Sequence, residues 1–293
     1  MSAIRTDPLT GALTYIVPER QKRPNNTTTS SCPFCPGGLE AKEHYEVKSF
    51  VNRWPAMGEN RCEVVLFGPD HCKDLAYYDI GHLLKVISLW QERLSYFYKR
   101  QDISYVLIFE NRGSEVGATI SHPHGQIYAF DFLPPIPKAE LERTLNYGCS
   151  LCKTSDSDYI VYSNDAFSLI CPAWSAWPYE LLAFSNEHVS DMIDEKFNSN
   201  GFAEVLMKAV RALDQHFEGP VPYMFFIHQY AKTDRLKEAS HLHAHFLPIW
   251  REKNVKRFVA AGELGSGVMF NPVDPKKAAS SLQKTLKHPT SLS

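Results

Sequence analysis

Two histidines separated by one residue stand in the segment Ser-His-Pro-His-Gly-Gln at 121–126. Hydrophobic runs on either side, Tyr-Val-Leu-Ile-Phe and Ile-Tyr-Ala-Phe, are typical of β-strands. Because side chains alternate across a strand, we expect His122, His124 and Gln126 to point to the same face. An imidazole can bind a metal or act as a nucleophile near neutral pH, so this face is the predicted active site.

Cysteine spacing is the second chemical signal. The seven cysteines include two Cys-x-x-Cys pairs, Cys32 with Cys35 and Cys149 with Cys152. The first residues of the chain contain no apolar export segment, so we interpret the pairs as metal ligands rather than as disulfides. Taken alone, either pair could also be a redox pair or two buried thiols.

An internal repeat strengthens the metal interpretation. One offset, extended by a two-residue insertion, pairs the ligand-type residues of the two halves: Cys32 with Cys149, Cys35 with Cys152, His71 with His188, and His122 with His241. Each half therefore offers two thiolates and two imidazoles, which is the ligand set of a closed tetrahedral zinc site. We predict two zinc ions per chain, one in each set, although the second could be another divalent metal.

The repeat extends to the predicted secondary structure. In each half two short strands precede a long helix, and further strands follow. The helix expected over 80–99 carries apolar residues at helical spacing. The prolines of Pro134–Pro137 cannot continue a central strand, and this segment is therefore the expected linker between the halves. The other expected elements are a helix over 192–217 and strands over 47–51, 63–67, 167–170, 180–184, 223–229, 241–247 and 255–261.

Composition restricts the possible partners. The chain is 44% hydrophobic and 22% charged, which is sufficient for a buried core. A net charge of −2 gives no reason to expect nucleic acid as a partner. No apolar run approaches the roughly 18 residues of a membrane span, and we expect a cytosolic protein that does not bind membranes.

Further motifs are spread along most of the chain: Asp7-Pro-Leu-Thr-Gly11, Arg20-Gln-Lys-Arg-Pro24, Cys32-Pro-Phe-Cys35, Pro69-Asp-His71, Phe109-Glu-Asn-Arg-Gly113, His122-Pro-His-Gly-Gln126 and Trp177-Pro-Tyr-Glu180. Together they resemble the galactose-1-phosphate uridylyltransferases of the histidine-triad superfamily. The resemblance implies an α+β fold of two histidine-triad-like halves, residues 1–136 and 137–293. Their antiparallel sheets would form a half-barrel with flanking helices. It also implies a homodimer with active sites near the subunit interface.

The implied reaction agrees with the chemistry of the motif. In the family, the histidine that matches His124 takes uridylyl from UDP-glucose, and galactose-1-phosphate then attacks the covalent intermediate. Such a reaction has ping-pong kinetics. Gln126 can donate to a phosphoryl oxygen without offering water an acid or a base, which favours transfer over hydrolysis. His122 would bind the first zinc, which would hold His124 in position rather than activate water.

Candidate substrate residues follow from the same resemblance. Guanidinium groups bind phosphate oxygens in a bidentate manner, and two arginines match the positions near the hexose phosphate. Three polar residues match positions that contact the nucleotide, although each could equally be a turn residue. Two residues near the C-terminus align loosely with a sugar-binding segment. In chain order the candidates are Arg20, Arg23, Asn52, Asn111, Thr119, Arg257 and Glu263.

The second metal site has an alternative ligand set. Some relatives use one glutamate and three histidines there, and the counterparts in this chain are Glu140, His228, His243 and His245. Thiolates should outcompete a carboxylate for zinc, so the set of two cysteines and two histidines is the expected one. The three histidines of the alternative set would then contact substrate or pack in the core.

Two other functions are compatible with these motifs. One is a phosphorylase of the same superfamily that cleaves ADP-sugars or dinucleoside polyphosphates, although such enzymes often carry serine where this chain has Pro123 and Gly125. The other is a nucleotide-binding zinc module that has lost catalysis. In that case a replaced His124 or Gln126 would be expected, and both residues are present.

Overall fold

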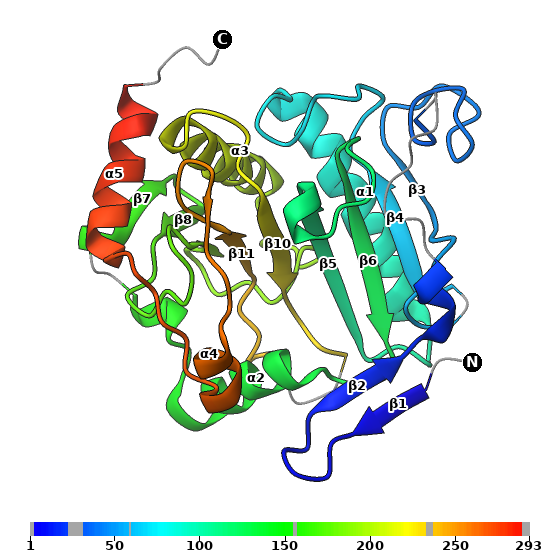
Figure 1. Cartoon of the computed structure of the whole chain (residues 1–293), viewed down its shortest axis with the longest axis horizontal. Helices are drawn as coiled ribbons and strands as arrows, with labels where there is room; N and C mark the ends of the chain where they lie inside the picture. The colour runs from blue at the N-terminus through cyan, green and yellow to red at the C-terminus, as the bar shows by residue number, and fades with distance from the viewer. Residues whose placement is uncertain (1–2, 23–31, 59, 155–156, 233–236, 289–293) are drawn as a thin grey trace.

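One large antiparallel sheet forms the centre of the chain. The structure is a computed structural model, and it describes residues 3–22, 32–58, 60–154, 157–232 and 237–288. The nine strands of the sheet have the order β3-β4-β6-β5-β10-β11-β9-β8-β7 (Figure 1). The bounds are β3 (Lys48–Val51), β4 (Cys62–Leu66), β5 (Tyr105–Arg112), β6 (His124–Phe130), β7 (Ile160–Ser163), β8 (Phe167–Ile170), β9 (Leu181–Ser185), β10 (Tyr223–His228) and β11 (His243–Pro248). The sheet does not close into a barrel, in agreement with the expected α+β half-barrel.

The strand order reflects the sequence repeat. The run β3-β4-β6-β5 meets the run β10-β11-β9-β8 in mirrored order, and β5 pairs with β10 at the centre. His124 begins β6 and His243 begins β11, so the two duplicated histidine motifs occupy equivalent places in the sheet. The division into two halves at residue 136 stays a prediction, because the sheet continues across the centre without a break.

Two long helices cover the same face of the sheet. They are α1 (Ile80–Lys99) and α3 (Ser199–His216), which contact each other behind the strands in Figure 1. Each begins at a side-chain cap, since Asp79 accepts a hydrogen bond from the His82 N–H and Asn198 accepts one from the Gly201 N–H. The bounds of α1 confirm the prediction from its apolar spacing.

The helix predicted over 192–217 begins later than expected, at Ser199. The carboxylates of Asp191 and Asp194 accept hydrogen bonds from backbone N–H groups two residues ahead. Such local bonds stabilise turns at the expense of helix, which explains the late start.

The proline-rich segment expected as a linker is helical rather than irregular. Pro134 is the N-cap of α2 (Pro135–Tyr147), and the prolines that follow belong to the first turn of the helix. Proline is well tolerated there because the first N–H groups of a helix have no partner within it. The expected strand over 255–261 was wrong. Only Val255–Lys256 (β13) pairs, with Trp250–Glu252 (β12), before the chain enters α4 (Ala261–Ser266).

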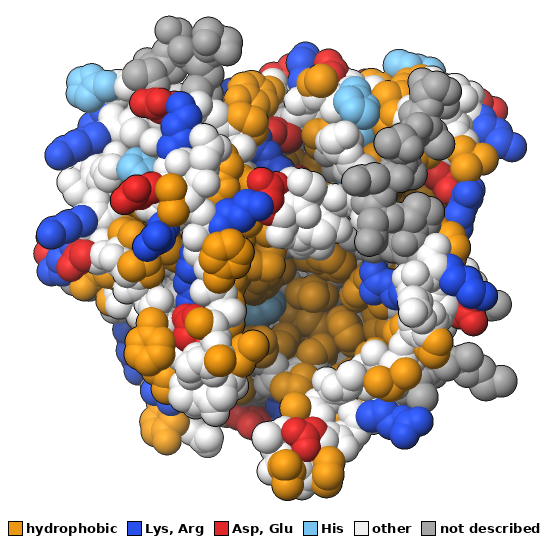
Figure 2. Space-filling model, viewed as in Figure 1, with side chains coloured by type: hydrophobic (Ala, Val, Ile, Leu, Met, Phe, Trp, Pro, Cys, Tyr) orange, Lys and Arg blue, Asp and Glu red, His pale blue; other side chains and the backbone are white. Residues whose placement is uncertain are grey.

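The remaining elements lie at the periphery. The hairpin of β1 (Ala3–Thr6) and β2 (Leu13–Ile16) projects from the lower right of Figure 1, and α5 (Pro275–Lys287) packs against α3 and β7. Short 3-10 turns complete the described chain: η1 (Pro18–Lys22), η2 (Ser114–Val116), η3 (Leu151–Lys153) and η4 (Ser157–Tyr159). Among the described helices none combines the length and apolarity that crossing a membrane requires. The face shown in Figure 2 is hollowed near its centre, with hydrophobic side chains on the floor of the hollow.

Candidate active site and metal centres

His124 is held in one orientation at the start of β6. Its Nδ1 lies 2.8 Å from the carbonyl oxygen of His122, and a carbonyl only accepts, so Nδ1 carries the ring proton. The lone pair is therefore on Nε2, which is the nitrogen that can act as nucleophile. The ring of Phe34 contacts the imidazole edge-on, with centroids 5.1 Å apart. Because β6 begins at His124, His122 lies in the turn before the strand rather than within it.

Gln126 lies two residues after His124 in β6, and its side chain is mostly buried, with the residue 8% exposed. The side-chain amide of Asn52 donates to its Oε1 at 3.3 Å, and the Oδ1 of Asn52 in turn accepts from the Trp54 N–H at 2.8 Å. With its oxygen engaged, Gln126 presents its amide N–H groups as donors. Two predicted residues, Asn52 and Gln126, are thus in direct contact.

A cavity of about 580 Å³ lies beside His124. Asn111 and Thr119 line it, so the structure brings two further predicted residues to the nucleophile. The strand end that carries Asn111 is fixed by Arg112, which also lines the cavity and forms buried ion pairs with Asp74 and Asp214. This cavity gives a substrate access to His124, although its lining also includes the carboxylates of Asp74, Glu110 and Glu115.

Other predicted substrate residues do not line the His124 cavity. Arg20 lies on η1, and Arg23 falls outside the described residues. Arg257 and Glu263 form an ion pair with each other, and Arg257 lines a separate pocket of about 590 Å³. The Glu263 carboxylate also accepts from the backbone N–H groups of Ala260 and Phe270, so it holds the loop after β13 in place.

The first predicted metal set is assembled as expected, and we call it the Cys32 group: Cys32, Cys35, His71 and His122. The Cys35 Sγ lies 3.4 Å from His71 Nδ1 and 3.5 Å from His122 Nδ1. These separations match the sulfur-to-nitrogen edge of a tetrahedral zinc site, about 3.5 Å for ordinary zinc bond lengths. His122 Nε2 donates to the Gly68 carbonyl at 2.9 Å, which presents Nδ1 to the thiols.

The Cys149 group repeats this arrangement with Cys149, Cys152, His188 and His241. His241 Nδ1 lies 3.2 Å from the Cys149 Sγ, and its Nε2 donates to the Ser185 carbonyl at 2.7 Å. Burial raises the pKa of Cys149, but hydrogen bonds with His241 and Cys152 and the charge of His241 together outweigh it and lower the pKa to about 7. A thiol that ionises so readily is suited to binding a metal.

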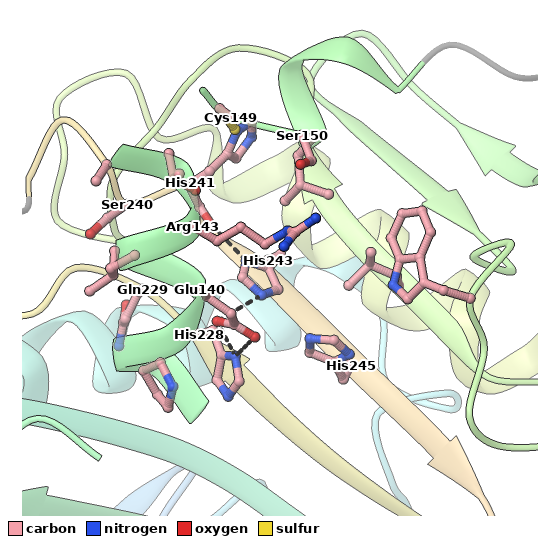
Figure 3. A pocket seen from close by; sticks show the side chains of 17 residues that line it. Glu140, Arg143, Cys149, Ser150, His228, Gln229, Ser240, His241, His243 and His245 are labelled. Atoms are coloured by element: carbon pink, nitrogen blue, oxygen red, sulfur yellow. Dashed lines mark hydrogen bonds and ion pairs between the residues drawn. The ribbon is translucent and has the colours of Figure 1, made fainter. Parts of the chain in front are cut away.

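The structure also assembles the alternative set, here called the Glu140 group: Glu140, His228, His243 and His245. Their ligand atoms all lie within 4.8 Å of one another. The Glu140 and Cys149 groups share no residue, so the competition that the sequence suggested between them does not arise. Figure 3 shows the Glu140 group in a cavity of about 440 Å³, where dashed lines join Glu140 to His228 and His243.

Charges in the Glu140 group suit a metal. Burial raises the pKa of Glu140, but hydrogen bonds from His228 and His243 outweigh it and hold the pKa well below its usual range. Burial lowers the pKa of His228, and it lowers that of His245 to about 4. Burial also disfavours a charge on His243, but the contact with Glu140 outweighs it and raises the pKa of His243. The carboxylate of Glu140 and the low pKa values of His228 and His245 match the protonation states in which these side chains bind metals.

Sequence reasoning missed the side chains that support the nucleophile. Phe34, which contacts His124, lies inside the first Cys-x-x-Cys segment, where an apolar residue carries no functional signal. Tyr45 donates its hydroxyl to the Phe34 carbonyl at 2.6 Å. Nothing in the spacing of these residues indicates the contacts, because they depend on how the loop folds over β6.

Comparison with known families gives matches over most of the chain. The model of the galactose-1-phosphate uridyl transferase N-terminal domain matches residues 40–134, and that of the C-terminal domain matches residues 118–281. The galactose-1-phosphate uridylyltransferase of Thermotoga maritima is 31% identical, over 97% of this chain and 99% of the relative. The enzyme of the same name from Streptomyces lividans is 29% identical, over 97% of this chain and 87% of the relative.

Solved structures give a similar result. A uridylyltransferase structure superimposes with a TM-score of 0.87 at 27% identity, covering 98% of this chain and 99% of the other. An ADP-glucose phosphorylase from Arabidopsis thaliana, with bound ADP-glucose, gives a TM-score of 0.78 at 22% identity and covers 97% and 98% of the two chains. The second likeness shows the fold alone.

Proposed function

Because the chain belongs to the galactose-1-phosphate uridylyltransferase family, whose members are nucleotidyltransferases, we propose that it exchanges uridylyl between UDP-glucose and galactose-1-phosphate. The observation that carries the proposal is the geometry of His124, whose Nδ1 is engaged by the His122 carbonyl at 2.8 Å. This contact directs the nucleophilic Nε2 lone pair to the substrate side of β6.

The reaction has two balanced steps. His124 Nε2 attacks the α-phosphorus of UDP-glucose, a phosphorus–nitrogen bond forms, and glucose-1-phosphate leaves with the electrons of the broken phosphorus–oxygen bond. A phosphate oxygen of galactose-1-phosphate then attacks the same phosphorus, which breaks the phosphorus–nitrogen bond and releases UDP-galactose. Since the first product leaves before the second substrate reacts, the kinetics are ping-pong.

Polar neighbours of His124 have distinct parts in this proposal. Gln126 donates its amide N–H to a phosphoryl oxygen, and Asn52 holds that amide in orientation through its contact with Oε1 at 3.3 Å. Asn111 and Thr119 line the adjacent cavity, where they can donate to the nucleotide. None of these amides and hydroxyls is a base for water near neutral pH, which favours transfer over hydrolysis.

Zinc fits the Cys32 group and the Cys149 group, on the chemistry and spacing of their ligands. When bound, zinc supplies structural support there, because two thiolates and two imidazoles leave no position for a reactive water. In the Cys32 group the side chain of His122 is a ligand while its carbonyl orients His124. The Cys149 group could hold another divalent metal instead of zinc.

A cytosolic homodimer completes the proposed assembly. Arg20 and Arg257 do not line the cavity beside His124 in their own chain. A second copy could supply Arg20 to the hexose phosphate, where a guanidinium group binds oxygens in a bidentate manner. Arg23, Arg257 and Glu263 keep their proposed substrate roles in this arrangement.

Product analysis tests the proposed function. The purified protein is incubated with UDP-glucose and galactose-1-phosphate, and separately with ADP-glucose and inorganic phosphate. We expect UDP-galactose and glucose-1-phosphate from the first mixture and no reaction in the second. ADP from the second mixture alone would establish a phosphorylase, and no product from either would indicate a nucleotide-binding protein without catalysis.

A further inference from the structure

The Cys149 group and the Glu140 group are built on the same two elements. Helix α2 carries Glu140 and ends at Tyr147, two residues before Cys149. Strand β11 begins two residues after His241 and carries His243 and His245. A metal bound by the Cys149 group would therefore tie the end of α2 to the start of β11, the two elements that place Glu140 opposite His243.

One residue links the two groups directly. His241 directs its ring Nδ1 to the Cys149 thiol at 3.2 Å, and its carbonyl oxygen lies 2.7 Å from His243 Nδ1. Because the carbonyl only accepts, His243 donates from Nδ1, and its Nε2 lies 3.6 Å from the Glu140 carboxylate. The same contact in the first half, between the His122 carbonyl and His124, directs the lone pair of the nucleophile.

Helix α2 depends on this anchor more than the long helices do. Only two of its residues are buried, Pro137 and Leu141, whereas six residues of α1 are buried. Elements with few buried apolar contacts open locally at low free-energy cost. Without the anchor at Cys149, α2 would open locally for a larger fraction of the time, and Glu140 would then leave its position opposite His243.

The Glu140 group is itself suited to a cation. The Nε2 of His245 is buried and has no hydrogen-bond partner among the described residues, and His245 lines the same cavity as the rest of the group. A buried polar atom without a partner is costly, and a bound cation would satisfy it. One carboxylate and three imidazoles suit a borderline divalent metal, whereas the thiolates of the Cys149 group suit zinc.

We propose that both groups bind a metal ion at the same time, and that the ion in the Cys149 group organises the Glu140 group through α2 and the His241 carbonyl. The chain then binds three metal ions, one in each of its ligand groups. Outer contacts that orient metal ligands typically contribute 10- to 100-fold to affinity. Loss of the Cys149 group should therefore weaken the Glu140 group by roughly this factor.

Cobalt titration of the full-length, metal-depleted protein tests the proposal. Co²⁺ bound to thiolates gives a near-ultraviolet charge-transfer band, whereas Co²⁺ in the Glu140 group contributes visible bands without it. The variants are Cys149→Ser, Glu140→Gln and, as a matched control at the duplicated position, Cys32→Ser. We expect three bound ions in the parent and two in Glu140→Gln, with both thiolate bands retained. Cys149→Ser should weaken the thiolate-free site, and Cys32→Ser should leave it unchanged.

Three results would overturn the proposal: no thiolate-free Co²⁺ in the parent, an unchanged thiolate-free site in Cys149→Ser, or equal weakening by Cys149→Ser and Cys32→Ser. Circular dichroism checks that each variant is folded, and His188→Ala replaces Cys149→Ser if that variant does not fold. Metal content is measured without substrate, so the outcome is independent of the proposed uridylyl transfer.

Discussion

The nucleophile of this chain is defined by contacts from two neighbouring segments. The His122 carbonyl fixes the tautomer of His124, and Phe34 packs against its ring. His124 and Gln126 could be predicted because alternation along a strand is a local property. Their supporting partners could not, since Asn52 and Phe34 approach from other parts of the fold and carry no spacing signal.

Replacement of Gln126 tests the proposed phosphoryl contact. Gln126→Ala removes an amide that stabilises charge developing in the transition state, and we expect kcat to fall by roughly 10²- to 10³-fold. Steady-state kinetics of UDP-galactose formation measure the effect. The control is Gln101→Ala at an exposed position, which should retain the parent rate. Equal activity of the two variants would exclude the contact.

Glu110 gives the protein a pH-dependent stability. Burial, with help from the nearby Asp74 charge, raises its pKa to about 8 from a usual value of 4.5. The folded chain therefore keeps a proton that the unfolded chain releases, so the free energy of unfolding falls as pH rises between these values. Glu110→Gln cannot titrate and can still accept from the Tyr223 hydroxyl, which donates to Glu110 at 2.9 Å.

Urea denaturation at pH 5 to 8 measures this effect. Relative to the parent, Glu110→Gln should gain stability as pH rises, by at most about 1.4 kcal/mol per pH unit. The exposed Glu195→Gln serves as the control and should follow the parent at every pH. A constant difference between Glu110→Gln and the parent would contradict the proposed protonation.

The sequence predicts the boundaries of some helices better than those of others. The bounds of α1 followed from a regular apolar stripe, and the structure adds Asp79 as the cap at its start. By contrast, α3 began late because Asp191 and Asp194 stabilise turns, and Pro135 opened a helix where a linker was expected. In each case a local side-chain effect decided the boundary against the periodic pattern.

Trp90 on α1 connects the two halves of the sheet. Its ring contacts Phe67, just after β4, and Phe225 of β10, with centroids 6.0 and 6.2 Å apart. Trp90→Ala leaves a cavity between them and should cost about 3–5 kcal/mol of unfolding free energy in urea denaturation. The exposed Glu92→Ala on the same helix should change it by no more than about 0.5 kcal/mol. A loss near the control value would mean that the halves do not depend on this contact.

The architecture as a whole follows the duplication. The repeat of cysteines and histidines predicted two equivalent metal groups and two equivalent strands, β6 and β11. It could not predict that β5 and β10 would join the halves into one sheet, since strand pairing across a repeat leaves no local pattern. It also could not show that both the Cys149 group and the Glu140 group form, because His241 of the first is followed closely by His243 and His245 of the second.

Subunit complementation tests the proposed dimer. His124→Gly and Arg20→Ala should each inactivate transfer, but a dimer formed from one chain of each kind has one intact site if Arg20 serves the partner's His124. Random mixing of equal amounts then restores about a quarter of the sites, measured as UDP-galactose formation after co-refolding. No recovery, with mixed dimers demonstrated, would place Arg20 in its own chain's site.

The covalent intermediate is the central claim, and intact-protein mass spectrometry after incubation with UDP-glucose alone tests it most directly. We predict a mass gain of one uridylyl group in the parent protein, none in His124→Gly, and loss of the added mass when galactose-1-phosphate is supplied. A parent protein that forms UDP-galactose without ever gaining the mass, or a His124→Gly variant that still gains it, would contradict the account.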